Sequence, residues 1–213
     1  AAEKAATIKI VDYRMIGAPF NLKYDSTDNP LNATKGVKLL ASLTPWYSLD
    51  AAKKSFFETR IAGSTYLALD ADANYVLAGR LAFGSILGAA LRDIPANHRF
   101  YSGGGASVRG YRYQSLGPTL TNGNVIGGSS LLEASLEARI KVTNNIGIVP
   151  FVDAGSAFAS SYPDFKDKVH YAAGLGLRYY TAIGPIRLDV AFPLNRRKGD
   201  KPVAMYFGIG QAF

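Results

Sequence analysis

The chain has 213 residues, a formal net charge of +8, 22 glycines and 12% aromatic residues. It has no cysteine, which excludes disulfides, thiolate metal sites and a cysteine nucleophile, and its two histidines are too few for a His-rich metal site. The basic residues are scattered along the chain with one cluster, Arg196, Arg197 and Lys198, which argues against a nucleic-acid partner. No apolar run reaches the roughly 18–20 residues of a transmembrane helix. The fold classes that the composition leaves open are a soluble β protein and a membrane β-barrel.

Alternation of apolar and polar residues predicts strands along most of the chain. A weak candidate at 5–16 comes first. The clearer candidates are 18–26, 36–44, 56–69, 75–88, 131–142, 146–157, 169–182, 185–194 and 202–213. Counting the weak segment gives ten strands, the even number expected of a bacterial barrel, and returns the N-terminus to the periplasmic side. We therefore predict an all-β fold, a transmembrane antiparallel β-barrel of about ten strands.

The segment 131–142 shows why a membrane barrel is favoured over a soluble sandwich. Its even positions from Leu132 to Val142 are apolar, whereas its odd positions include Glu133, Glu137 and Arg139. An apolar face of about five side chains per strand is long for a soluble strand and suits a tilted membrane span. The charged and glycine-containing face suits a wet or plugged lumen, and strands can cross lipid only in a closed sheet.

The connections alternate in length, as expected for short periplasmic turns and long outer loops. The short ones are 70–74, 143–145 and 183–184, and the long ones are 45–55, 89–130, 159–168 and 195–201. The connection 27–35 must be periplasmic despite its length, which is a mild misfit. Without a linker, helical segment or strict repeat, residues 1–213 are expected to form one domain.

The connection 89–130 is the longest, and loops of this size are usually functional or disordered. Its centre, residues 99–118, combines glycines with aromatics and arginine, which is not a disordered composition. From the residues alone, a surface loop with a solvated arginine and a functional segment are about equally good interpretations.

Four residues in this loop carry a resemblance to a known family: Val108, Arg109, Gly110 and Tyr111. They resemble the Val-Arg-Gly-Phe/Tyr signature in the sixth extracellular loop of the BamA/TamA outer-membrane insertase superfamily, and the following residues 113–118 resemble the TamA branch. Segments that fit the same family are 28–36, 151–155, 184–189 and 206–213. The resemblance covers about residues 18–213, with five strands after the loop, as in the family.

The resemblance implies that the loop folds into the barrel lumen and that Arg109 contacts acidic side chains on the inner wall. Two positions match by motif, Glu137 and Asp153. Alternation independently places both on the lumen-facing side of their strands. A guanidinium in a confined lumen needs carboxylate partners, so we expect a lumenal pin that serves anchoring and gating equally.

In the last strand, Gly208 and Gly210 have lumen-facing parity and Phe213 has the opposite, membrane-facing parity. Packing against the plugging loop and a weak, kinkable seam are equal alternatives for the glycines. The resemblance implies a lateral gate at this strand. It also implies that Phe213, at the membrane interface, is a signal for insertion of this protein itself.

The resemblance further implies a bacterial outer-membrane factor for assembly, insertion or translocation of client outer-membrane proteins. Its partners would be outer-membrane lipid and client proteins. A TamB-like, inner-membrane-anchored partner would be reached through periplasmic POTRA domains. Relatives have sixteen strands and POTRA domains, whereas residues 1–6 show neither a POTRA segment nor a signal peptide, so we expect a fragment of a longer protein. Alternatives are a two-partner secretion pore and a truncated structural barrel that is inactive alone.

An enzyme is the least favoured class. Ser102, Ser107, His98 and His170 supply suitable residue types, but no Gly-x-Ser-x-Gly motif is present. Gly103 to Gly105 lack the Lys-Ser/Thr of a phosphate-binding loop. We expect no enzymatic activity, no cofactor and no metal.

Overall fold

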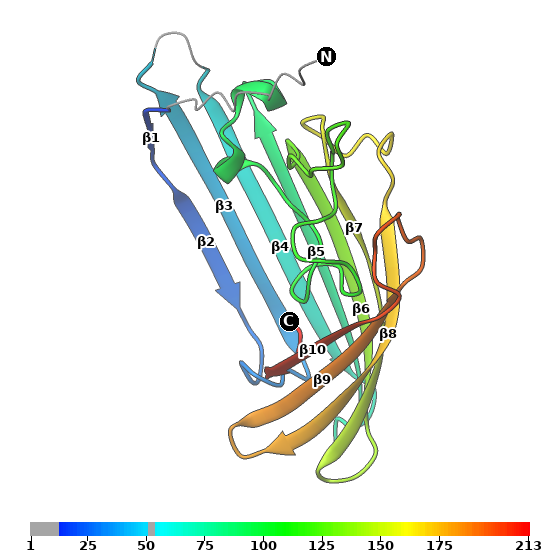
Figure 1. The fold of residues 1–213 in the computed structure, drawn as a ribbon. Coiled ribbons are helices and arrows are strands. Elements are labelled where there is room, and N and C mark those ends of the chain that lie inside the picture. The colour runs from blue at the N-terminus through cyan, green and yellow to red at the C-terminus, as the bar shows by residue number, and fades with distance from the viewer. Residues whose placement is uncertain (1–12, 51–53) are drawn as a thin grey trace.

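The computed structural model describes residues 13–50 and 54–213, and it forms one antiparallel sheet (Figure 1). The strands are β1 (Met15–Gly17), β2 (Phe20–Asp25), β3 (Gly36–Ser48), β4 (Phe56–Ala68), β5 (Tyr75–Leu87), β6 (Ser130–Lys141), β7 (Ile146–Phe158), β8 (His170–Thr181), β9 (Gly184–Pro193) and β10 (Ala204–Ile209). Two short 3-10 helices, η1 (Leu91–Asp93) and η2 (Ala96–His98), lie in the connection between β5 and β6. The all-β, roughly ten-stranded antiparallel fold is thus confirmed.

The tenth strand arises differently from the prediction, because β1 and β2 both pair with β3. β1 pairs with residues 46–48 of β3 and β2 with residues 38–43, so the two are successive parts of one interrupted arm. Pro19 lies in the interruption and Pro45 lies opposite it on β3. Neither proline has an N–H to donate to the ladder, which accounts for the break. The weak candidate 5–16 falls mostly outside the described residues.

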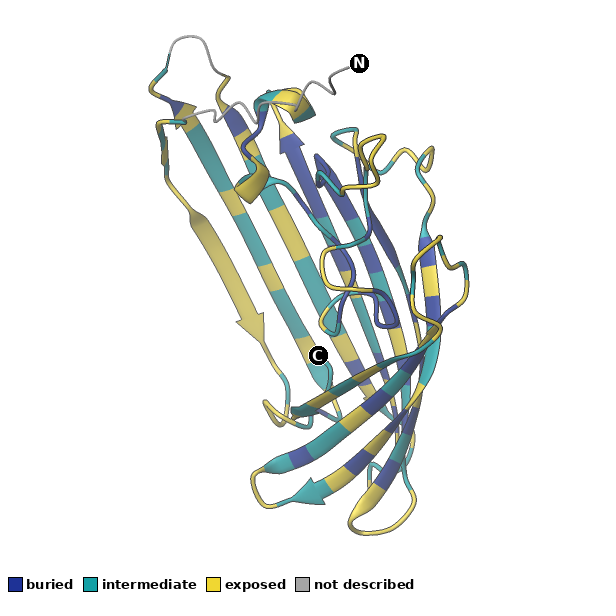
Figure 2. Cartoon of the chain, viewed as in Figure 1, coloured by how far each residue is buried: buried dark blue, intermediate teal, exposed yellow. Residues whose placement is uncertain are grey.

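Most strands have one apolar face that the fold leaves uncovered, seen as alternating bands in Figure 2, whereas β2 is exposed along its whole length. On β10, for example, Met205 is 70% and Phe207 75% exposed. The opposite face looks into the concave side, where most buried residues lie. β3, β4, β5 and β7 have 13 residues each, about 43 Å at ~3.3 Å per residue, long enough to cross a bilayer when tilted. These strands have the dimensions and the two-faced pattern of a barrel wall.

The sheet curls strongly but does not close on itself among the described residues (Figure 1). β10 pairs only with β9, and the β1–β2 arm pairs only with β3, so each end of the sheet presents an edge. Within the described part of the chain, no helix is long and apolar enough to span a membrane.

The connection between β5 and β6 folds back onto the concave side of the sheet (Figure 1). Three isolated bridges shape it: Phe100 with Gly128, Ser102 with Leu116, and Thr119 with Val125. Ile94 and Phe100 pack with Ile86 and Leu131 of the wall in one buried apolar cluster. Because Ile94 and Phe100 are buried against the wall, this part of the loop has a fixed place in the fold.

The connection between β2 and β3, which was too long for a simple turn, has its own hydrogen-bonded structure. The carboxylate of Asp28 accepts hydrogen bonds from the amides of Thr34 and Lys35 and from the Thr34 hydroxyl. Asn29 accepts from two further amides, those of Leu31 and Asn32. Residues 28–35 therefore form a compact cap at the short-turn end of the sheet.

The prediction that residues 202–213 form one strand with Phe213 facing the membrane is wrong. β10 ends at Ile209, and Gly210 has φ +86°, a left-handed conformation that turns the chain away from the sheet. The last residues cross to the other wall, where the Phe213 ring packs against Tyr66 at 6.4 Å between centroids. The Phe213 carbonyl accepts a hydrogen bond from Arg139. Phe213 therefore lies on the concave side, away from the lipid-facing surface.

Candidate functional site

The segment 102–111 is folded so that Arg109 points into the wall of the sheet. Gly103 and Gly104 both have positive φ, and the Gly104 amide donates to the Val108 carbonyl at 3.1 Å. Gly110 follows with φ +94°, and a Cβ there would lie 3.2 Å from the Pro193 nitrogen. Glycine is needed at this position both for its conformation and for the close approach of β9.

The Arg109 guanidinium contacts three carboxylates, each from a different strand. It forms a bidentate pair with Asp153 of β7, with Nε–Oδ2 at 2.7 Å and Nη2–Oδ1 at 2.9 Å. Its Nη1 lies 2.8 Å from Glu137 Oε1 on β6 and 3.2 Å from Asp189 Oδ2 on β9. The Arg109 amide also donates to Asp153 at 3.1 Å. This planar donor set matches what a guanidinium provides and what a lysine ammonium would not.

Two further arginines complete a buried ionic network around Arg109. Arg139 Nε donates to Glu137 at 3.0 Å, and Arg178 Nη1 lies 2.5 Å from Asp189 Oδ1. All six side chains are buried. A fourth guanidinium, that of the half-buried Arg187, lies 3.8 Å from Asp189 Oδ2, so four guanidinium groups surround three carboxylates. Arg109 joins the Glu137–Arg139 pair to the Asp189–Arg178 pair. A buried network of this kind is tolerable only when every charge has a partner.

The Arg109 side chain also stacks on an aromatic ring of the wall. Its Cζ lies 3.5 Å from the centroid of Phe151, two residues before Asp153 on the same face of β7. Stacking on a ring desolvates the guanidinium face while the edge remains free to donate hydrogen bonds. Phe151 and the three carboxylates together define a socket shaped for one arginine.

The neighbours of Arg109 in the motif fix the loop against β8 and β9. Val108 and Tyr111 are buried in one apolar cluster with Leu116 and Ala172. The Tyr111 hydroxyl lies 3.0 Å from the Tyr171 carbonyl and 2.8 Å from Asn195 Oδ1. The whole motif is therefore embedded, and only its arginine carries charge into the wall.

A second polar contact joins the loop to the wall beside the arginine socket. The Ser107 hydroxyl donates to Glu133 of β6, which also accepts from Arg80 of β5 at 3.5 Å. From the sequence, Ser107 was one of the residue types that an enzyme could use. Its contacts among the described residues are a carboxylate, the Gly103 amide and the Ser102 hydroxyl, which indicate a positioning role within the loop.

The last strand reaches the same site through Tyr206. Its hydroxyl accepts a hydrogen bond from the Gly110 amide at 3.0 Å and donates to the Tyr111 carbonyl at 3.2 Å. Its ring lies so close to Gly105 that a Cβ there would come within 2.8 Å of it. The motif is therefore held from both sides, by wall carboxylates on one side and by β10 on the other.

The structure thus brings together six of the nine residues singled out from the sequence, namely Val108, Arg109, Gly110, Tyr111, Glu137 and Asp153. Gly208 and Gly210 lie apart from the loop. A Cβ on Gly208 would face Arg187 and one on Gly210 would face Leu31. Sequence reasoning missed Asp189 and Tyr206. Their lumen-facing parity was visible in the alternation, but nothing in it indicated contact with the loop.

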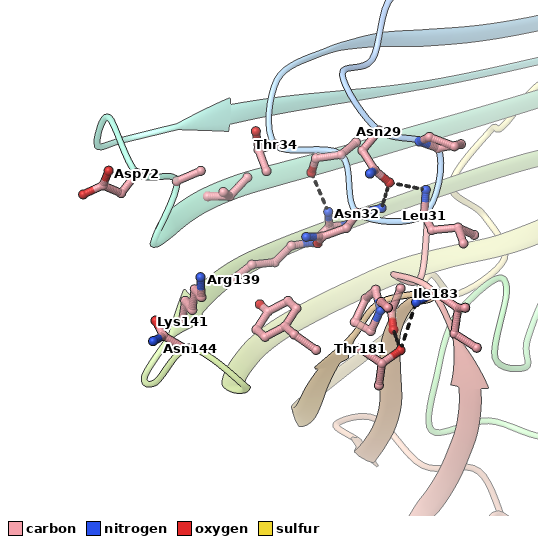
Figure 3. A pocket seen from close by; sticks show the side chains of 18 residues that line it. Asn29, Leu31, Asn32, Thr34, Asp72, Arg139, Lys141, Asn144, Thr181 and Ile183 are labelled. Atoms are coloured by element: carbon pink, nitrogen blue, oxygen red, sulfur yellow. Dashed lines mark hydrogen bonds between the residues drawn. The ribbon is translucent and has the colours of Figure 1, made fainter.

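At the short-turn end, a cavity of about 570 Å³ lies between the 28–35 cap and the turns of β4–β5, β6–β7 and β8–β9 (Figure 3). Its lining is about equally polar and apolar, and the polar residues include Asn32, Arg139 and Lys141. Gln211 ties the C-terminal tail to this cap, because its amide donates to the Leu31 carbonyl at 3.0 Å and its side chain donates to Asn32 at 2.9 Å. The C-terminal tail is therefore joined to the cap at this end of the sheet.

The Asp28 carboxylate at the centre of the cap is electrostatically stabilised. Partial burial acts to raise its pKa, but hydrogen bonds from Thr34 and Lys35 outweigh this effect and hold the pKa below its usual 3.8. The cap is therefore built around a carboxylate that stays ionised at neutral pH.

Comparison with known proteins shows the family to which this architecture belongs. A sequence profile described as the Omp85 superfamily domain matches residues 13–213. The outer membrane protein assembly factor BamA of Nitratidesulfovibrio vulgaris is 33% identical over 146 residues, which cover 66% of this chain and 18% of the relative. BamA of Neisseria meningitidis serogroup B is 23% identical over 222 aligned positions, covering 89% of this chain and 28% of the relative. The chain thus spans less than a third of either relative.

The fold also matches a solved structure. The crystal structure of BamA from Haemophilus ducreyi lacking POTRA domains 1–3 superimposes with a TM-score of 0.72 at 22% identity, over 89% of this chain and 41% of that one. The named relatives are BamA proteins, so assignment to the TamA branch remains a prediction. The chain belongs to the Omp85 superfamily and is a β-barrel domain of the bacterial outer membrane.

Proposed function

We propose that this barrel domain acts in the assembly or insertion of client outer-membrane proteins, without enzymatic chemistry, cofactor or nucleotide. The observation that carries the proposal is the Arg109 socket within an Omp85 chain, in which a loop is pinned to three barrel strands by buried charge. The two assembly-factor relatives support the same role.

The proposed work is to lower the barrier for entry of a client strand into the membrane. An unpaired strand edge offers backbone donors and acceptors that a client strand can pair with. β10 supports this role because it has only six residues, pairs with β9 alone among the described strands, and is followed by a tail that leaves the sheet. Gly208, within this strand, adds local flexibility.

In this proposal the loop motif positions the edge. Tyr206 connects β10 to the backbone of Gly110 and Tyr111, and Arg109 connects that backbone to β6, β7 and β9. A displaced loop would therefore release β10 from its place relative to the wall. We further propose that POTRA domains and a TamB-like partner act with this barrel in the whole protein, as the TamA resemblance implies.

The experiment compares the wild type with Arg109→Ala in proteoliposomes, using folding of a client barrel as the readout. We expect the variant to slow client assembly, and Arg112→Ala, an exposed arginine three residues away, to leave it unchanged. Full activity of Arg109→Ala would refute the proposal. Failure of the wild type to accelerate client folding would favour the secretion pore or the inactive barrel.

A further inference from the structure

The tail that follows β10, residues 210–213, is attached to the cap on the concave side of the sheet. The Gln211 amide donates to the Leu31 carbonyl at 3.0 Å. The Phe213 ring packs against a buried cluster that includes Ala33 of the cap. The tail therefore contacts the cap through its backbone and through an aromatic side chain.

The Gln211 side chain joins the wall of the sheet to the cap. Its Oε1 accepts from Arg178 Nε at 2.7 Å, and its Nε2 donates to Asn32 Oδ1 at 2.9 Å. A guanidinium can only donate, so Arg178 fixes the direction of the Gln211 amide and leaves its NH2 group for Asn32, which lines the cavity at this end of the sheet (Figure 3). Arg178 is itself held by Asp189, which Arg109 and Arg187 also contact.

Arg139 connects the cap and the tail to the ionic network. Its Nη1 donates to the Ala33 carbonyl at 3.1 Å, and its Nη2 donates to the Phe213 carbonyl at 3.1 Å. Its Nε donates to Glu137 at 3.0 Å, and its Cζ lies 5.5 Å from the centroid of the Phe213 ring. One buried guanidinium thus contacts the cap, the tail and a carboxylate of the socket.

Arg139 and Arg109 divide the Glu137 carboxylate between them. Arg109 Nη1 contacts Oε1, and Arg139 Nε contacts Oε2. While Arg109 occupies Oε1, Arg139 can reach only one oxygen of Glu137, and its Nη2 remains free to hold the Phe213 carbonyl. Docking of the loop therefore determines what Arg139 has left to donate to the tail.

Removal of either partner changes this arrangement. When Arg109 leaves, both oxygens of Glu137 are open to Nε and Nη2 of Arg139, which lie on one edge of the guanidinium and suit a bidentate carboxylate pair. That pair would take Nη2 away from Phe213. When the tail leaves instead, Nη2 loses its acceptor and competes with Arg109 for Oε1. The loop and the tail therefore act on the same side chain.

We propose that Gln211 is a positioning residue for β10, and that docking of the tail and docking of the loop are coupled through Arg139. β10 is then held at two points, at the loop by Tyr206 and at the cap by Gln211. A coupling free energy is reciprocal, so release of the loop should loosen the tail and release of the tail should loosen the loop. This inference goes beyond the proposed assembly role, and its test does not use client assembly.

The test measures thiol labelling of the whole chain in detergent micelles, since the chain has no native cysteine. Val108→Cys places a thiol at a position that is buried when the loop is docked. We expect Gln211→Ala to speed its labelling about ten-fold, and to do so in the Tyr206→Phe background as well. The matched control is Asn144→Ala, which removes an exposed amide side chain at the same end of the sheet and should leave the rate unchanged.

The opposite direction is measured with a thiol in the cap. Ala33 is 3% exposed, and we expect labelling of Ala33→Cys to become about ten-fold faster when Arg109→Ala is added. Arg112→Ala, a change at an exposed position of the loop, should not affect it. Ser130→Cys reports general unfolding, because Ser130 is fully buried at the other end of β6. Its labelling should stay slow in both variants.

Three outcomes would overturn the proposal. The first is unchanged Val108→Cys labelling in Gln211→Ala, or a change that disappears in the Tyr206→Phe background, since Arg139 would then not carry the coupling. The second is acceleration in one direction only, which reciprocity does not allow. The third is equal acceleration of Ser130→Cys, because it would show a general loosening of the sheet in place of a link between tail and loop.

Discussion

Replacing Arg109 with alanine removes four side-chain hydrogen bonds to three buried carboxylates. Glu137 and Asp189 keep Arg139 and Arg178 as partners, but Asp153 loses its bidentate ion pair. Arg139, Arg178 and Arg187 remain in the network, but all three pair with Glu137 or Asp189, and none with Asp153. Loss of one partner from a buried ion pair costs about 3–5 kcal/mol, and we expect the loop to detach from the wall to relieve this cost.

Cysteine labelling reports loop detachment directly, because the chain has no native cysteine. Val108→Cys places the thiol in a position that is fully buried when the loop is docked. We expect slow labelling in the otherwise wild-type chain and at least about a hundred-fold faster labelling when Arg109→Ala is added, since each 1.4 kcal/mol changes an opening equilibrium ten-fold. Arg112→Ala, which changes an exposed arginine of the same loop, should leave the rate unchanged.

Two further variants separate charge from geometry. Arg109→Lys keeps the positive charge but cannot donate through a planar fork to Asp153, so we expect an intermediate labelling rate. Adding Asp153→Asn to Arg109→Ala removes the unpaired carboxylate and should recover part of the protection. If Arg109→Ala labels as slowly as the wild-type background, the socket does not hold the loop and the reasoning fails.

Three other changes test neighbouring contacts. Gly110→Ala forces a side chain into φ +94° against β9 and should cost about 1–3 kcal/mol, seen as a lower urea midpoint. Gly199→Ala, also at φ +94° but in open space, should cost less. Tyr206→Phe removes the hydroxyl that contacts Gly110 and Tyr111 and should speed amide exchange in β10 by about ten-fold. Unchanged exchange would show that the Tyr206 hydroxyl does not hold β10 against the loop. Because the folded pKa of Asp28 lies below 3.8, its stabilising effect is complete above that pH and declines as pH falls through the folded pKa. The thermal unfolding temperatures of the wild type and Asp28→Asn should therefore converge as the pH is lowered. A difference between the two temperatures that does not change with pH would contradict this account.

Much of the wall could be predicted because period-2 alternation reports both the strands and the side to which each residue points. It placed Glu137 and Asp153 on the concave side before any contact was known, and the structure shows both at Arg109. The same parity applied to Asp189. It could not be paired with Arg109 because curvature, which alternation does not encode, brings β9 beside β6 and β7 around the loop.

At both ends of the chain, alternation alone does not report where a strand ends or where its ladder is interrupted. Alternation continues through Ala212 and Phe213, and an extended tail can show the same period as a strand. What ends β10 is the left-handed conformation of Gly210, and a glycine in a sequence permits that conformation without requiring it. At the other end, Pro19 and Pro45 break the ladder at one level, although they are 26 positions apart in the sequence.

The buried charges around Arg109 connect the loop to the proposed role. The three carboxylates that its guanidinium contacts come from β6, β7 and β9. Arg109 therefore holds the loop against three strands at once. Tyr206 ties β10 to the same loop, because its hydroxyl contacts the backbone of Gly110 and Tyr111. We therefore expect Arg109→Ala to slow client assembly by displacing the loop and with it β10, whereas Arg112→Ala, which leaves the loop docked, should not slow it.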